Sequence, residues 1–257
     1  MQAVISFMEP LFVAPIRRFG RGFLFLIRLL VRIRCSYRQI SAVLTQIHSI
    51  GTRSLLLIMV SGFFVGMVLS LQGYRELAQF GATDAVGAIL GLSLFRELGP
   101  VLTALLFAGR AGTSITAEIG LMKATDQLMA MDLMAIDPLT RVVLPRFMAG
   151  VLSLPVLTAV FNMMGLIGGS FYAVNIMGVD SGIFWGNMQA HIDLHADFMV
   201  GVYKSVMFGL LVSLTAVYTG FYAVPTGSGV GRATTQTVVV SAVLMLVFDF
   251  IMTSLIK

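Results

Sequence analysis

The sequence predicts an all-α, polytopic membrane protein, and its composition and the spacing of its charges support that prediction. Of the 257 residues, 58% are hydrophobic and 11% are charged, and the mean hydropathy is +0.94. Soluble domains carry about 25% charged residues. Uncharged stretches recur that approach or exceed the roughly 20 residues a helix needs to cross a bilayer. These stretches are continuously apolar and do not alternate, so a membrane β-barrel is disfavoured.

The segment before the first span has the pattern of a basic amphipathic helix. At 100° per residue, four arginines fall within a stripe of about 60°: Arg17, Arg21, Arg28 and Arg32. The opposite side holds Phe19, Phe23, Leu26, Ile27 and Leu30. Such a helix lies in the cytoplasmic interface with its arginines at lipid head groups. The alternative is a partly inserted helix packed against the bundle. We therefore treat 1–257 as one membrane domain, with an interfacial region at 1–52 and a bundle at 53–257.

About five spans follow along the chain. They are expected at 54–74, 86–109, within 147–179, at 204–224 and at 233–256. The third stretch is too short for two crossings and a turn, so it is read as one long or tilted helix. Pro155 is a possible kink in that helix because proline removes an intrahelical hydrogen bond. Gly227, Gly229 and Gly231 are read as a tight turn between the last two spans.

The distribution of basic residues orients these spans. Arginines are frequent before the first span, and lysine and arginine recur between 110 and 146, whereas 180–197 contains neither. The positive-inside rule then puts the N-terminus in the cytoplasm and the C-terminus on the outer side. The net charge of +5 is thus a topology signal and does not indicate nucleic-acid binding.

Arg96 and Glu97 are the only charges in the apolar run 86–109. Ionisable groups are costly in hydrocarbon, and they usually face a bundle interior, a partner or a watery cavity. The pair therefore marks either a substrate cavity or gate, or a helix–helix contact or short helical break. Small residues at helix-packing spacing also recur, in the pairs Gly62 and Gly66, Gly87 and Gly91, and Gly165 and Gly169.

The connection from about 110 to 146 has apolar residues at mixed three- and four-residue intervals, which indicates short amphipathic helices. Its methionines offer an adaptable apolar surface of the kind that binds partners. These helices either pack under the bundle or receive force from a cytoplasmic partner.

Several joined motifs resemble the MlaE permease family. They are Phe95-Arg96-Glu97-Leu98-Gly99-Pro100-Val101-Leu102, Ala108-Gly109-Arg110-Ala111-Gly112, Ala117-Glu118-Ile119-Gly120-Leu121-Met122 and Ile136-Asp137-Pro138 with Arg141 and Pro145-Arg146 beyond it. The resemblance covers nearly the whole chain. Asp126-Gln127 stands where the family pattern has Glu-Gln, and the negative charge is kept.

This resemblance implies the transmembrane subunit of an ATP-driven ABC transporter in the bacterial inner membrane, which moves phospholipids and maintains outer-membrane lipid asymmetry. It implies a homodimer with an ATPase subunit (MlaF-like), an MCE-domain protein (MlaD-like) and, through the ATPase, a STAS-domain protein (MlaB-like). The implied coupling residues are Glu118, Ile119, Gly120 and Met122, and the implied lipid-binding residues are Leu71, Tyr74, Arg96 and Glu97.

The chain itself is expected to be no enzyme and to hold no cofactor. It lacks a GxxxxGK[ST] phosphate-binding loop, so ATP and Mg²⁺ would be bound by the separate ATPase. An ion- or proton-coupled secondary transporter of an amphipathic substrate is the alternative function, although Glu97 and Asp249 are few carboxylates for a proton relay. The single Cys35 excludes an internal disulfide. His191, Asp193, His195 and Asp197 favour a solvated or partner-facing surface over a metal site.

Overall fold

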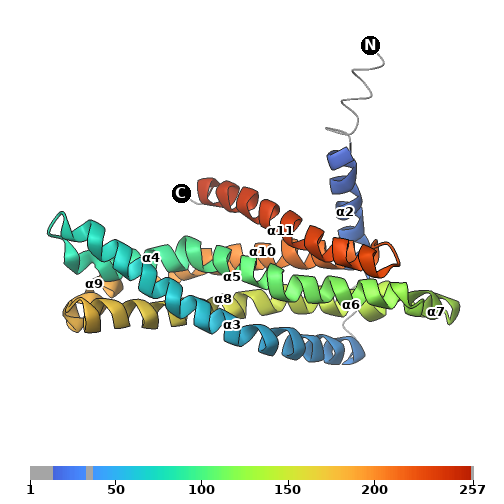
Figure 1. Ribbon diagram of the computed structural model, residues 1–257, viewed down its shortest axis with the longest axis horizontal. Coiled ribbons are helices and arrows are strands. Elements are labelled where there is room, and N and C mark those ends of the chain that lie inside the picture. The colour runs from blue at the N-terminus through green and yellow to red at the C-terminus, as the bar shows by residue number, and fades with distance from the viewer. Residues whose placement is uncertain (1–13, 33–36, 256–257) are drawn as a thin grey trace, which may run out of the picture.

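The structure is a computed structural model that describes residues 14–32 and 37–255. Across these residues it is helical and contains no strand. Five helical segments are long and apolar enough to cross a membrane, namely Gln39–Ala78, Thr83–Ala124, Leu139–Ile176, Ala196–Phe221 and Gly227–Leu255. They run roughly along the longest axis of the molecule (Figure 1). The predicted fold class, an all-α polytopic membrane protein, is confirmed.

Helix α2 (Ala14–Val31) stands across one end of this bundle (Figure 1). Phe25 and Leu29 are buried, and the ring of Phe25 lies 5.6 Å from that of Tyr218. Phe23 and Leu30 of the predicted apolar side remain exposed. The helix therefore does pack against the bundle, and it also keeps an apolar side free for lipid. The side chains of 14–19, which include Arg17 and Phe19, and Cys35 in the segment 33–36 lie outside the described part.

The first span, α3 (Tyr37–Ala78), packs along α8 (Leu144–Ser170) through glycines. A Cβ on Gly66 would collide with the carbonyl oxygen of Gly165, and one on Gly62 would lie 2.7 Å from that of Phe161. A Cβ on Gly168 would likewise collide with the Phe63 carbonyl. These small residues let the two backbones touch, as their spacing predicted.

The second span is one continuous helical rod with two wider turns. It consists of a 3₁₀ turn Thr83–Ala85, then α4 (Val86–Ser93), a π turn Leu94–Leu98, α5 (Gly99–Phe107), a π turn Ala108–Gly112 and α6 (Thr113–Ala124). Pro100 explains the first π turn, because proline lacks an N–H and clashes with the carbonyl four residues earlier. The Gly99 N–H instead donates to the carbonyl of Leu94, five residues back. The rod reaches well past the predicted end at 109 before the short helix α7 (Gln127–Leu133).

The third span is a single helical rod, as predicted. It begins with a π turn at Leu139–Val143, continues as α8 with Pro155 inside, and ends with a π turn at Phe171–Ile176. Helix α9 (Ser181–His191) follows at the end of the molecule opposite α7 (Figure 1). Its N-cap, Asp180, accepts a hydrogen bond from the backbone N–H of Ile183, which satisfies one of the free donors of the first turn.

The last two spans differ sharply in burial. In its most apolar window α10 (Leu194–Phe221) is 61% buried, whereas α11 (Gly227–Leu255) is only 11% buried. Three threonines bind α6, α10 and α11 together near one end: Thr237 Oγ1 lies 2.8 Å from that of Thr116 and 2.5 Å from that of Thr219. The predicted glycine turn is wrong, because Gly227, Gly229 and Gly231 lie in the first turns of α11. The chain reverses just before them, around Pro225.

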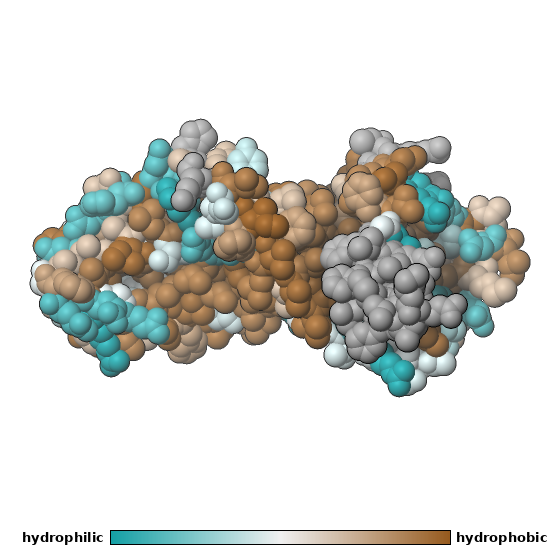
Figure 2. Space-filling view, turned by 90° about the horizontal axis from the view of Figure 1, so that it is seen from above, coloured by the Kyte–Doolittle hydropathy of each residue, from teal (hydrophilic) through white to brown (hydrophobic). Residues whose placement is uncertain are grey.

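The surface has the layering of a membrane protein. Figure 2 shows a hydrophobic band across the middle of the molecule, with hydrophilic residues gathered toward both ends. Helix α7 lies at one of these ends and α9 at the other (Figure 1). The band matches the apolar middle of the five long helices, so the protein is a multi-pass membrane protein.

Candidate functional site

The Arg96–Glu97 pair lies in the π turn that Pro100 imposes on the second span. A π turn inside an α-helix is rare and is frequent at functional sites. Its extra residue widens the helix and changes the direction of the side chains on it. Both Arg96 and Glu97 are exposed on the surface of the single chain, although they lie far from the ends of their rod. The helix continues through this turn, so the alternative of a short helical break is met only by a local widening of the helix.

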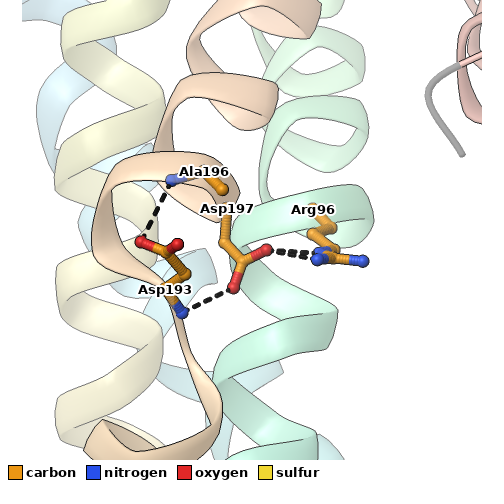
Figure 3. Close-up of polar contacts among 4 residues, drawn as sticks. All are labelled: Arg96, Asp193, Ala196 and Asp197. Atoms are coloured by element: carbon orange, nitrogen blue, oxygen red, sulfur yellow. Dashed lines mark hydrogen bonds and ion pairs between the residues drawn. The ribbon is translucent and has the colours of Figure 1, made fainter.

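Arg96 also makes a helix–helix contact. Its Nε donates to Asp197 Oδ1 over 2.6 Å, and its Nη2 lies 2.5 Å from the same oxygen. Figure 3 shows the arginine reaching across to the first turn of α10. The Asp197 side chain is only 2% exposed, whereas that of Arg96 is 56% exposed. A buried carboxylate thus holds one edge of the Arg96 guanidinium, and its remaining N–H donors stay available.

Asp197 is fixed by a second bond. Its Oδ2 accepts a hydrogen bond of 3.0 Å from the backbone N–H of Asp193, and Asp193 Oδ1 accepts one from the N–H of Ala196 (Figure 3). The two aspartates therefore cap the start of α10 reciprocally, in the manner of a capping box. The carboxylate that holds Arg96 is thereby held by the helix end itself.

Of the other predicted lipid-binding residues, Glu97 adjoins Arg96 on the π turn, and Leu71 and Tyr74 lie on α3. Glu97 has no ion pair or hydrogen bond among the described residues. Leu71 and Tyr74 are partly buried near the end of α3, where Tyr74 packs against the main hydrophobic core. No hydrogen bond or ion pair in the described part joins Tyr74 to Arg96 or Glu97. One chain therefore brings Arg96 and Glu97 together and leaves Leu71 and Tyr74 on a different helix.

A second buried ion pair joins the last two spans. Lys204, whose side chain is 2% exposed, donates from Nζ to Asp249 Oδ1 over 2.9 Å and to Thr253 Oγ1 over 2.7 Å. Removing one partner of such a pair would leave an uncompensated charge in an apolar medium. This pairing gives Asp249 a structural role in holding α11 to α10.

The predicted coupling residues divide into buried and accessible ones. Ile119 is fully buried, and a Cβ on Gly120 would lie 3.2 Å from Val230. Met122 packs against the hydrophobic cluster at this end of the bundle. Glu118 is half exposed, and its Oε2 accepts a hydrogen bond of 3.1 Å from Arg146 Nε. Ile119 and Gly120 thus shape this end from within, and Glu118 reaches its surface.

An exposed apolar surface lies just beyond them, on and around α7. Its members are Leu121, Met129, Leu133, Met134 and Ile136, all of which are exposed. Asp126 begins this segment in the left-handed conformation, with φ of 57°, and Ala135 ends it with φ of 58°. At the far end, Asp137 forms an ion pair of 2.7 Å with Arg32, the residue directly after α2. The segment is thus tied to the end of α2 and carries side chains suited to a partner.

Two open grooves lie along α11. One, of about 580 Å³, is lined by Arg110, Thr113, Ser114, Ala117, Thr234, Thr235, Val238 and Val239. The other, of about 560 Å³, is lined by Ser228, Gly231, Arg232, Thr235, Gln236, Val239 and Val240. Neither groove includes Arg96, Glu97, Leu71 or Tyr74. No cluster of three or more metal-ligating side chains occurs within the described residues.

Sequence reasoning missed Asp197 as the partner of Arg96, since the two are 101 positions apart. It also missed Lys204 as the partner of Asp249, 45 positions away. A usable signal existed in both cases, because each acidic and basic member lies in or beside an apolar run. A charge in such a place needs an opposite charge from another helix.

Comparison with known proteins gives a consistent result. The sequence model of the family described as Permease MlaE matches residues 43–255. The chain is 51% identical over 210 residues to the intermembrane phospholipid transport system permease protein MlaE of Haemophilus influenzae, which covers 82% of this chain and 80% of the relative. It is 36% identical over 216 residues to a probable ABC transporter permease protein of Rickettsia typhi, covering 84% and 83%. It is 31% identical over 212 residues to the chloroplast protein TRIGALACTOSYLDIACYLGLYCEROL 1 of Arabidopsis thaliana, covering 82% and 60%.

Proposed function

Because the chain belongs to the MlaE permease family, we propose that it is the membrane-spanning subunit of an ATP-driven transporter that moves phospholipids between the inner and outer membranes. The observation that carries the proposal is the 51% identity, over most of both chains, to a permease named for intermembrane phospholipid transport. In this role the chain maintains the lipid asymmetry of the outer membrane. It spans the inner membrane with its N-terminus in the cytoplasm and its C-terminus in the periplasm.

The lipid site lies where Arg96 and Glu97 meet the apolar surface of the spans. A phospholipid needs apolar walls for its acyl chains and a few polar partners for its head group. Arg96 suits a phosphate, because a guanidinium offers several donors in a fixed fork and only part of that fork is used by Asp197. Leu71 and Tyr74 extend the site along the first span.

Two copies of the chain enclose this site. The exposed positions of the single chain support a homodimer, because α11 presents Val239, Val243, Leu246 and Phe250 on one stripe with little of its apolar window buried. A stripe with this spacing packs against a partner helix or meets lipid.

The energy comes from a separate ATPase subunit, since this chain lacks a phosphate-binding loop and is not itself an enzyme. The ATPase docks on the exposed apolar residues around α7 and on Glu118, and the buried Ile119 and Gly120 pass its movement into α6. An MCE-domain protein binds on the periplasmic side, and a STAS-domain protein binds the ATPase. ATP and Mg²⁺ are held by the ATPase.

Photo-crosslinking in cells tests the lipid site. We expect a photoreactive amino acid at Leu71 or Glu97 to capture phospholipid several-fold more than one at Met163. Met163 is the matched control, because it is exposed in the middle of a span and meets bulk lipid. Equal capture of phospholipid at all three positions would contradict the assignment of Leu71 and Glu97 to the lipid site.

A further inference from the structure

Asn162 is a buried amide in the apolar interior of α8, and it is 4% exposed. Its Oδ1 accepts no hydrogen bond within the described part of the chain. Buried polar atoms are nearly always hydrogen-bonded. Burying an unpaired amide costs free energy that burying a leucine would not, so the amide calls for a physical explanation. The neighbours of Asn162 supply that reason.

The amide stands against the turn that carries Arg96 and Glu97. A Cβ on Gly99 would collide with both Asn162 Oδ1 and the carbonyl oxygen of Leu94. A Cα–H of Gly99 therefore points at Asn162 Oδ1, which is the geometry of a weak C–H···O contact. Gly99 is the residue whose N–H closes the π turn onto Leu94. The contact thus meets the turn at the point where it closes.

Other contacts show that the turn is held from two sides. From α8, Gly165 leaves room for the side chain of Leu94. A Cβ on Gly165 would lie only 2.9 Å from that side chain. From α10, Gly201 leaves room for the carbonyl of Phe95, and Asp197 binds Arg96. On the α8 side, the polar side chain that meets this turn is that of Asn162.

We propose that Asn162 is a positioning residue, whose amide locks the Leu94–Leu98 π turn through Gly99 and so fixes where Arg96 and Glu97 stand in the lipid site. Pro100 removes the regular hydrogen bond to the Arg96 carbonyl and so favours the wider turn. The contact with Asn162 then holds Gly99, the residue that closes this turn, in place. This inference rests on the proposed function for its link to lipid, and its structural part stands independently.

The experiment compares Asn162→Leu and Asn162→Ser with Thr158→Val. Asn162→Leu keeps the branched shape but is larger and removes the amide, whereas Asn162→Ser is smaller and keeps a polar group too short to reach Gly99. Thr158 is equally buried on the same helix, and its hydroxyl donates a hydrogen bond to the carbonyl of Leu154, one turn earlier in α8. Thr158→Val is therefore the matched control. All variants carry Cys35→Ser and are compared as folded dimers after size-exclusion chromatography.

Two readouts separate the lock from the function. The first is the maleimide labelling rate of a cysteine at position 97, which reports the placement of the turn without reference to lipid. The second is phospholipid capture by a photo-crosslinker at position 97, relative to one at position 71. We expect both Asn162 variants to change the labelling rate at least threefold and to lower capture at 97 at least fivefold. Capture at 71 should stay within twofold, and Thr158→Val should change none of these.

An unchanged labelling rate in both Asn162 variants would overturn the proposal, as would an equal loss of capture at 71 and 97, which would indicate a general packing role. If the parent protein captures no lipid at either position, the proposed function fails. A shifted labelling rate would then still establish the lock.

Discussion

Asp197 joins the second span to the fourth through one carboxylate that also caps a helix. Hydrogen bonds to charged groups contribute about 1.5–3 kcal/mol, and the exposure of Arg96 reduces that value. We therefore expect Asp197→Asn to lower the stability of the purified protein by about 1–2 kcal/mol, measured as an earlier thermal transition. Asp84→Asn is the control, because the exposed Asp84 side chain makes no ion pair in the described part. An unchanged transition in Asp197→Asn would show that the pair does not stabilise the fold.

At the scale of elements, the contact between α3 and α8 depends on the absence of side chains. Gly66→Ala should force the two helices apart, because the new Cβ meets the carbonyl of Gly165. Overpacking of this kind costs about 1–3 kcal/mol. Gly73→Ala in the same helix should be neutral or slightly stabilising, since nothing lies within 4 Å of its Cβ. Thermal unfolding of the two variants in detergent makes the comparison, and equal transitions would argue against the close contact.

Glu118 has a partner within the chain, so a single charge reversal mixes two effects. Glu118→Lys faces Arg146 with a like charge and also removes the charge that we propose contacts the ATPase. The double variant Glu118→Lys, Arg146→Glu restores an opposite pair across the same 3.1 Å contact. We expect the double variant to regain thermal stability and still to capture several-fold less ATPase in co-purification. Full recovery of ATPase capture would mean that Glu118 acts only through Arg146.

The elements could be predicted where one local rule dominates. Charge-free length located all five spans, and the spacing of small residues indicated the close contact made by Gly62, Gly66 and Gly165. The ends were predicted too short, because α6 continues past the apolar run on polar but helix-compatible residues. Gly99-Pro100 is a local signal for the π turn, whereas the contact of Arg96 with Asp197 depends on how α10 packs beside that turn. Ion pairs between distant helices depend on packing as well, which spacing along the chain does not reveal.

At the scale of the whole molecule, the asymmetry of basic residues predicts the orientation in the membrane. A cysteine at Ser181, which begins α9, should react with an impermeant thiol reagent added to the periplasmic side. One at Ser228, at the start of α11, should stay unreacted until the membrane is opened. Both positions are exposed at opposite ends of the bundle, and Cys35→Ser removes the native thiol. The reverse labelling pattern would invert the topology.

The central claim is that this chain moves phospholipid with energy from ATP, and reconstitution tests it most directly. The permease is placed in vesicles with the proposed ATPase and MCE-domain partners, and labelled phospholipid is supplied in one compartment only. We predict lipid movement that requires ATP and Mg²⁺ and is unaffected by an imposed pH gradient. Glu97→Lys should lower the rate of lipid movement, because the new lysine and Arg96 would be two like charges in one low-dielectric site. Movement driven by the pH gradient without the ATPase, or no phospholipid movement with ATP, would contradict the account.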